Sequence, residues 1–275
     1  MHSYPNPDLI KKNLTHPSLC SKIICVQETP STNSLAKKIA REGCPHGTLV
    51  ICANQTAGRG RGGRQWQSNE HTGLCMSIIL KPTAKTEDMM RYTPAFALSV
   101  AKALQKFGVD CEIKWPNDIL VQGKKICGIL SEAIFSGSRC EYLICGIGVN
   151  VNDVFSPSDD KYITQYDPAQ AKDVETFACS VFSVTGRITE REALAAAIIN
   201  EIQSVFHKCE TESDFKCVLE EYSALSCIIN REVRVFTDNP FTGIAVGLDT
   251  FGRLLVQTSR GTVCLNEGDV SLRLV

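Results

Sequence analysis

The apolar residues in the first part of the chain follow two spacings, one helical and one typical of buried strands. Residues 34–42 and 95–107 each place apolar side chains on one helical face, and each segment is followed by a glycine. Residues 48–53 and 74–80 are short continuous apolar runs, which predict buried strands. This part of the chain is therefore expected to alternate helices with strands.

The next part of the chain predicts an antiparallel meander followed by helices. Four strand-like runs are separated by short turns rich in glycine and polar residues, at residues 111–115, 119–122, 125–135 and 141–151. Helical patterns resume at about residues 192–209 and 213–224. Together these segments predict an α/β (α+β) fold with one mixed sheet and flanking helices.

The last fifty residues differ in texture from the rest. Short β-rich runs at 233–236, 243–248, 254–257 and 262–265 are separated by Asp, Asn and Gly turns. This pattern predicts a small β-barrel of the SH3-like kind. We expect a main domain at residues 1–226 and a C-terminal module at 227–275.

Composition narrows the functional classes. The formal net charge is −1 and the sequence pI is about 6.5, which argues against a general nucleic-acid binder. No apolar run of about 18 residues and no signal-like start are present, so we expect a cytoplasmic protein without a membrane partner. The 14 cysteines are scattered singly, with no C-x-x-C pair, and are expected to be reduced core residues.

A loop rich in arginine and glycine is the first candidate site. Residues 55–66 contain Arg59, Arg61 and Arg64 among four glycines. Two guanidinium charges ~8 Å apart repel by roughly 2 kcal/mol at an effective dielectric constant near 20. A bound anion would offset this repulsion, and arginine forks donate paired hydrogen bonds to carboxylate or phosphate groups. The alternative is a solvated surface loop.

Two nucleotide motifs that this loop resembles do not fit. Gly58, Gly60 and Gly63 match G-x-G-x-x-G, but a dinucleotide fingerprint opens an amphipathic helix and is followed about 20 residues later by an acidic residue. Residues 63–70 are polar without a pattern, and Ile78 and Ile79 stand at the acidic position. No G-x-x-x-x-G-K-[ST] motif occurs, which disfavours a P-loop mechanism.

A second candidate site follows a predicted strand, at Lys114-Trp115-Pro116-Asn117-Asp118. Proline favours an extended conformation in the preceding residue and ends the strand, so Lys114 is expected to lie on rigid backbone. A lone strand lysine is usually solvated. Asn117 and Asp118 give this one more weight, because their side chains can orient a ligand at the turn.

These motifs, in this order, resemble the biotin-protein ligase family. The shared features are Ser31-Thr32-Asn33, the Arg/Gly loop ending at Trp66, the Lys114 motif, residues 124–130 and the Gly-Ile-Gly-Val-Asn segment at 146–150. The resemblance is strong over about residues 28–152 and weak in the C-terminal module. It implies a class II synthetase-like mixed sheet and an ATP-dependent ligase that forms biotinyl-5'-AMP and then biotinylates a lysine of a biotin carboxyl carrier domain.

The resemblance also implies site residues. Those expected to contact biotin are Ser31, Thr32, Asn33, Gln55, Gly58, Arg59, Gly60, Arg61, Lys114 and Gly128. Arg59, Arg61 and Lys114 are expected to act catalytically, because attack of a carboxylate on a phosphate brings anions together. Arg64, Trp66, Asn117 and Asn150 are expected near the nucleotide. Mg²⁺ is expected to accompany ATP, with Asp118 as its candidate ligand.

Three other interpretations agree less well with the sequence. A lipoate-protein ligase shares the chemistry, but Ser31, Thr32 and Asn33 favour a ureido group over an apolar lipoyl slot. A DNA-binding repressor would need a winged helix, and only about 27 residues precede the first motif. A catalytically inactive biotin-binding module is disfavoured because all the charged positions are present. We expect no nucleic-acid partner, and a homodimer stays open.

Overall fold

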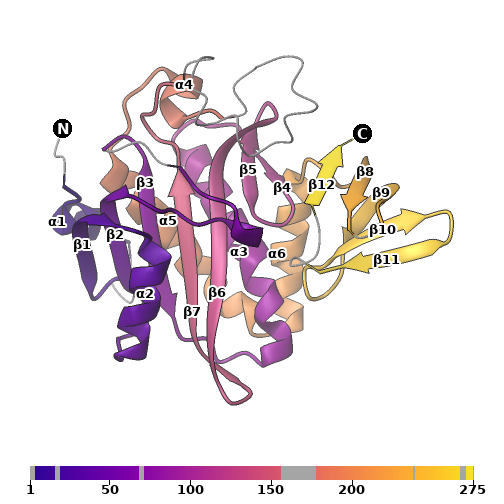
Figure 1. The fold of residues 1–275 in the computed structure, drawn as a ribbon, viewed down its shortest axis with the longest axis horizontal. Coiled ribbons are helices and arrows are strands. Elements are labelled where there is room, and N and C mark those ends of the chain that lie inside the picture. Colours follow the sequence, from indigo (N-terminus) through magenta and orange to yellow (C-terminus); the bar gives the residue numbers. More distant parts are fainter. Residues whose placement is uncertain are drawn as a thin grey trace.

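The chain forms a large central sheet with helices on both faces and a smaller C-terminal sheet (Figure 1). The computed structural model describes residues 4–15, 19–67, 71–155, 178–237, 239–266 and 271–274. Within these residues no helix is long and apolar enough to cross a membrane.

The central sheet has seven strands in the order β1-β2-β3-β7-β6-β5-β4. Their bounds are β1 Ile23–Thr29, β2 Thr48–Gln55, β3 Leu74–Leu80, β4 Glu112–Lys114, β5 Asp118–Val121, β6 Lys124–Ser136 and β7 Arg139–Val149. Strands β1 and β2 are parallel, and every other neighbouring pair is antiparallel. The meander from β4 to β7 and the mixed sheet predicted from the sequence are confirmed.

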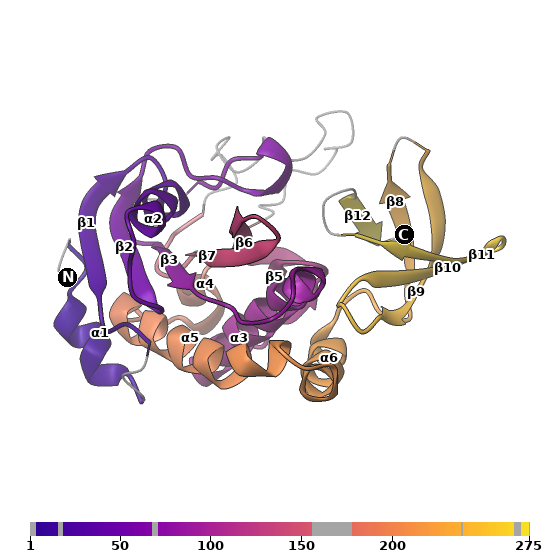
Figure 2. The ribbon, with the colours of Figure 1, turned by 90° about the horizontal axis from the view of Figure 1, so that it is seen from below.

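Helices cover the sheet on both faces. They are α1 Pro7–Asn13, α2 Thr32–Arg41, α3 Tyr92–Lys106, α4 Val181–Thr185, α5 Arg191–Phe206 and α6 Glu212–Leu225. Figure 2 shows α3 and α5 together below the sheet and α2 above it. Successive residues of β2 serve the two faces: Leu49 and Ile51 join the large core under α3 and α5, whereas Val50 joins the smaller core under α2. This explains why β2 is apolar throughout.

The C-terminal sheet is antiparallel, in the order β11-β10-β9-β8-β12. Its strands are β8 Glu232–Phe236, β9 Phe241–Leu248, β10 Leu254–Thr258, β11 Gly261–Leu265 and β12 Ser271–Leu274. It contacts the main fold beside the Lys114 motif, where the Trp115 indole donates to the backbone oxygen of Gly252 at 3.0 Å. Arg91 donates to the oxygen of Thr250 at 3.0 Å. The C-terminal β module predicted from the sequence is present.

The cysteines generate a prediction about the folded protein. All 14 are free, and only Cys217 and Cys264 are exposed, while Cys25 is half-buried. Burial raises the pKa of the Cys20 and Cys111 thiols to about 12, so these thiols are both covered and protonated at neutral pH.

We therefore expect a disulfide reagent to modify two thiols rapidly in the native protein and all 14 after unfolding in denaturant. A Cys217→Ser/Cys264→Ser double variant should lose the rapid phase, which identifies the thiols. Rapid modification of many thiols in the native wild-type protein would contradict the packing described here.

Candidate active site

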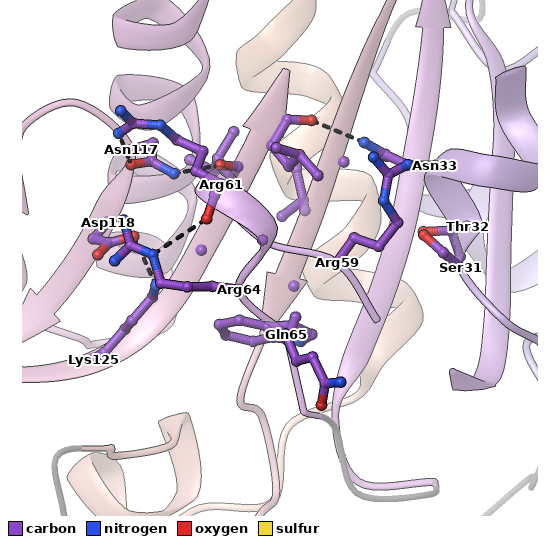
Figure 3. A pocket seen from close by; sticks show the side chains of 18 of the residues that line it. Ser31, Thr32, Asn33, Arg59, Arg61, Arg64, Gln65, Asn117, Asp118 and Lys125 are labelled. Atoms are coloured by element: carbon purple, nitrogen blue, oxygen red, sulfur yellow. Dashed lines mark hydrogen bonds and ion pairs between the residues drawn. The ribbon is translucent and has the colours of Figure 1, made fainter. Parts of the chain in front are cut away.

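One pocket collects most of the residues that the sequence singled out (Figure 3). It is formed by the start of α2, the loop after β2, the turn between β4 and β5, and the facing surfaces of β6 and β7. The predicted residues that line it are Ser31, Thr32, Asn33, Gln55, Arg59, Gly60, Arg61, Arg64, Trp66, Lys114, Asn117, Asp118 and Gly128. Segments far apart in the sequence therefore meet here.

A buried hydrogen-bonded network forms one end of the pocket. Gln55 Oε1 accepts from the Thr32 backbone N–H at 2.8 Å and lies 3.2 Å from its hydroxyl. The Ser77 hydroxyl lies 2.8 Å from Thr32 Oγ1 and 2.6 Å from Asn33 Oδ1. Ser31, Thr32 and Asn33 are each less than 5% exposed. This end is a preorganised set of donors and acceptors, which suits a polar group of a ligand.

Glycines in β6 and β7 let side chains lie directly on the sheet. A Cβ at Gly146 would stand 2.1 Å from Asn33 Oδ1, and a Cβ at Gly148 would stand 2.4 Å from the Trp66 indole. Gly128 pairs with Gly148 across the two strands and lies under the same indole. Side chains at these positions would displace Asn33 and Trp66.

The loop after β2 folds back on itself above these glycines of β6 and β7. The Gly60 N–H donates to the Arg64 oxygen at 2.7 Å, and the Trp66 N–H donates to the Gly58 oxygen at 3.0 Å. Gly62 and Gly63 have φ values of 61° and 75°, a region that glycine adopts without strain. The tight turn sends Arg59 and Arg61 in different directions.

Arg59 points to the network end and Arg61 to the opposite end (Figure 3). The Arg59 guanidinium lies 3.0 Å from Glu132 Oε1. Arg61 donates to Asn117 Oδ1 at 3.0 Å, and the Asn117 amide in turn donates to the Ile129 oxygen at 2.6 Å. The strand β6 thus helps to place both arginines.

Three further cations surround the Arg61 end. Lys114 ends β4, and its backbone pairs with Asp118 at the start of β5. Lys125 forms an ion pair with Asp118 at 2.8 Å and lies over the Trp66 ring, 5.5 Å from its centroid. Arg64 donates to the Arg61 backbone oxygen at 3.2 Å. This end therefore carries a strong positive charge and suits phosphate or carboxylate groups.

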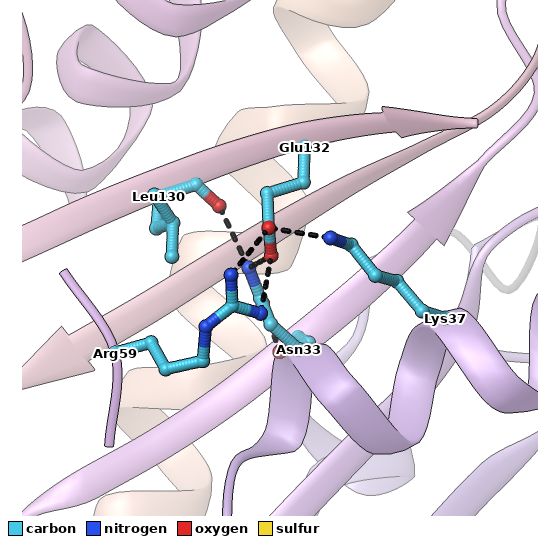
Figure 4. Close-up of polar contacts among 6 residues, drawn as sticks. Asn33, Lys37, Arg59, Leu130 and Glu132 are labelled. Carbon is cyan, nitrogen blue, oxygen red and sulfur yellow. Dashed lines mark hydrogen bonds and ion pairs between the residues drawn. The ribbon is translucent and has the colours of Figure 1, made fainter. Parts of the chain in front are cut away.

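Glu132 is a partly buried carboxylate among cations (Figure 4). It accepts from Lys37, from the Asn33 amide at 2.9 Å and from Arg59. Burial would raise the pKa of Glu132, but the hydrogen bonds from Lys37 and Asn33 and the charges of Lys37 and Arg59 lower it below its ordinary value. Glu132 is therefore ionised at neutral pH and neutralises part of the positive charge.

Two predicted residues lie beside the pocket and do not line it. Gly58 closes the loop, where a Cβ would stand 2.2 Å from the Trp66 oxygen. The Asn150 amide is buried and donates to the oxygens of Lys125 and Cys179 at 3.3 and 3.0 Å. A direct contact between Asn150 and a nucleotide stays a prediction.

The sequence did not single out several residues of the site. Ser77 sits in the middle of an apolar strand, where one serine carries no recognisable signal. Lys37 and Glu132 are separated by 95 positions, and only the fold brings them together. Gly146 and Gly148 belong to a segment that was noted as a motif, but their function as a floor depends on the pairing of β6 with β7.

The described part of the chain forms no metal site from protein side chains alone. Among the residues that the structure describes, no group of three or more His, Cys, Asp or Glu side chains could hold a metal ion. Asp118, the predicted candidate, lies in the pocket but pairs with Lys125.

Comparisons with known proteins agree on one family. Residues 23–150 match the biotin/lipoate A/B protein ligase family, and residues 228–273 match the biotin protein ligase C-terminal domain. The bifunctional ligase/repressor BirA of Bacillus spizizenii is 35% identical over 249 residues, which are 88% of this chain and 71% of that protein. A biotin–[acetyl-CoA-carboxylase] ligase of Mycobacterium tuberculosis is 26% identical over 89% of this chain and 86% of its own.

The fold is also that of a solved relative. The structure of the Aquifex aeolicus biotin protein ligase in complex with biotin and ATP matches with a TM-score of 0.76 and 29% identity, over 93% of this chain and all of that one. Two family matches, relatives that align along most of the chain and a shared fold together show that the chain belongs to the biotin-protein ligase family.

Proposed function

We propose that this protein is an ATP-dependent biotin–[acetyl-CoA-carboxylase] ligase, which forms biotinyl-5'-AMP and then transfers biotin to a lysine of a biotin carboxyl carrier domain. The single observation that carries the proposal is the polarity of the pocket. One end is a buried hydrogen-bonding network suited to a ureido group, and the other end is cationic. Biotin has a ureido ring at one end and a carboxylate at the other.

The charged end fits the first reaction step. A biotin carboxylate oxygen attacks the α-phosphorus of ATP, the bond to the pyrophosphate oxygen breaks, and pyrophosphate leaves with the electron pair. The reaction joins two anions and builds charge on phosphate oxygens, so preplaced cations lower its barrier. Lys114 and Arg61 are the residues to which we assign this function, and Asn117 holds Arg61 in place.

For Arg59 we propose a function that differs from the catalytic one implied by the resemblance. Its guanidinium lies beside Glu132 and Asn33, at the network end. We propose that Arg59 closes the loop over bound biotin, and that it adds charge at the carboxylate only if it leaves Glu132.

We propose that the remaining residues bind the nucleotide. Arg64 adds charge near the phosphates, and the flat indole of Trp66 offers a stacking surface for the base. Mg²⁺ would be held mainly by the ATP phosphates, because it keeps several waters. Asp118, which lines the pocket, would be its candidate protein ligand. When bound, Mg²⁺ supplies charge neutralisation of the leaving pyrophosphate.

Transfer completes the proposed reaction. The neutral amine of an acceptor lysine attacks the carbonyl carbon of biotinyl-5'-AMP, an amide bond forms, and AMP leaves. We propose that residues 1–226 carry this chemistry and that residues 227–275 form the C-terminal module, whose contact through Trp115 and Gly252 adjoins the Lys114 motif. A cytoplasmic location and a homodimer stay predictions.

The activity itself is the first test. Purified protein with Mg²⁺-ATP and biotin should exchange labelled pyrophosphate into ATP and label a biotin carboxyl carrier domain. Biotin should also raise the melting temperature, whereas lipoate should not, because a ligand that binds only the native state stabilises it. Exchange that depends on lipoate instead of biotin would identify a lipoate ligase, and no exchange with either would refute ligation.

Lys114→Ala is expected to lower the rate of pyrophosphate exchange by about a hundredfold or more, because loss of one preorganised charge at a reacting phosphate typically has that effect. Lys22→Ala is the matched control, since Lys22 is exposed and lies outside the pocket. Near-normal exchange in Lys114→Ala, with an unchanged melting temperature, would remove Lys114 from the reaction.

A further inference from the structure

The Glu132 carboxylate joins three segments that meet at the network end of the pocket. It lies on β6, its Asn33 and Lys37 partners lie on α2, and its Arg59 partner lies on the loop after β2. The side chain of Glu132 is 15% exposed, so its partners, rather than water, satisfy most of its charge. Such a carboxylate is well suited to hold neighbouring groups in one orientation.

The contacts of Asn33 are satisfied in one orientation of its amide. The amide nitrogen donates to the Leu130 oxygen at 3.1 Å and to Glu132 Oε2 at 2.9 Å. The amide oxygen lies 2.6 Å from the Ser77 hydroxyl and rests on the Gly146 backbone. A flipped amide would set its oxygen against two acceptors. An ionised Glu132 therefore keeps the Asn33 oxygen as an acceptor.

Arg59 is placed by the same carboxylate. Its side chain is 46% exposed, so without a partner it could adopt other rotamers in solvent. The ion pair with Glu132 holds it beside Asn33, and Lys37 on the same oxygen balances the carboxylate charge when Arg59 moves. The loop therefore has a defined anchor on β6.

We propose that Glu132 is a positioning residue for recognition of the ureido ring, acting by fixing the Asn33 oxygen as an acceptor for a ligand N–H and by anchoring Arg59 over that end. The inference rests on the proposed function and deepens it. A ureido ring has N–H groups to donate, whereas a lipoyl dithiolane has none, so the fixed acceptor favours the ureido ligand.

Glu132→Gln tests the inference, because glutamine keeps the shape but loses the charge. Its amide N–H can also donate to the Asn33 oxygen, which would favour the flipped Asn33 amide. We expect the KM and the Kd for biotin to rise at least tenfold, while kcat stays within about threefold and the KM for ATP is unchanged. Glu28→Gln is the matched control: Glu28 also accepts from an asparagine amide, at 2.9 Å from Asn54, but it is exposed, and Asn54, unlike Asn33, does not line the pocket.

A double-variant cycle separates positioning from general stability. If Glu132 acts partly through Asn33, Glu132→Gln should weaken biotin binding much less in an Asn33→Ala background than in wild type. Glu132→Asp keeps the charge but moves it away from Asn33 and Arg59, because the side chain is shorter. It should also raise the Kd for biotin, and it replaces Glu132→Gln in the test if that variant does not fold.

Two results would overturn the inference: a wild-type Kd for biotin in folded Glu132→Gln or Glu132→Asp, or fully additive effects with Asn33→Ala. A lower melting temperature with an unchanged Kd would likewise show a merely structural residue. If wild-type protein exchanges pyrophosphate in a biotin-dependent way and the Glu132 variants bind normally, only this inference fails. If wild-type protein shows no such exchange, the proposed function fails first.

Discussion

Positive charge is crowded around one pocket, and the fold must hold it there before any anionic ligand arrives. Five cationic residues line the pocket: Arg59, Arg61, Arg64, Lys114 and Lys125. Two carboxylates and one amide distribute this charge. Glu132 holds Arg59, Asp118 holds Lys125 and Asn117 holds Arg61. Because each partner lies on the β5–β6 part of the sheet or the turn before it, the electrostatics of the site depend on the register of that meander.

The same sheet provides the steric side of the site. Gly128 and Gly148 face each other across β6 and β7, and Gly146 stands two residues earlier on β7. Without side chains at these positions, the Asn33 amide and the Trp66 indole approach the backbone closely. The glycines thus leave the space of the pocket open, and charged side chains line it. The pocket therefore has a hydrogen-bonding end and a cationic end.

Much of the fold was predictable because its signals are local. The strand β3 has the predicted bounds, since an apolar run of seven residues there is closed by a glycine and a lysine. Helix α3 was predicted within three residues at its start, and Pro94 lies in its first turn. Helix α1, strand β1 and strand β12 were not predicted, because short segments with few apolar residues, or an edge position, give weak periodicity.

The residues of the site also fall into those that the sequence predicts and those that it does not. Motifs that lie together in the sequence, such as Ser31 to Asn33 and Lys114 to Asp118, were found from the residues and from the family resemblance, and they line the pocket. Glu132 and Ser77 were not found, because their function arises from contacts between strands and helices distant in the sequence. The direction of Arg59 was not predictable either, since its guanidinium pairs with Glu132 on the distant strand β6.

We propose that residues 58–64 form a charged loop that binds the anionic part of the ligand and closes over it. Hydrogen exchange of the backbone amides in residues 55–66, measured without ligand, with biotin and with biotinyl-5'-AMP, tests this most directly. We expect slower exchange of the loop amides with biotin and the slowest with biotinyl-5'-AMP, while exchange in the exposed turn at residues 136–139 stays unchanged. Equal exchange of the loop in all three states, at ligand concentrations that saturate binding, would contradict it.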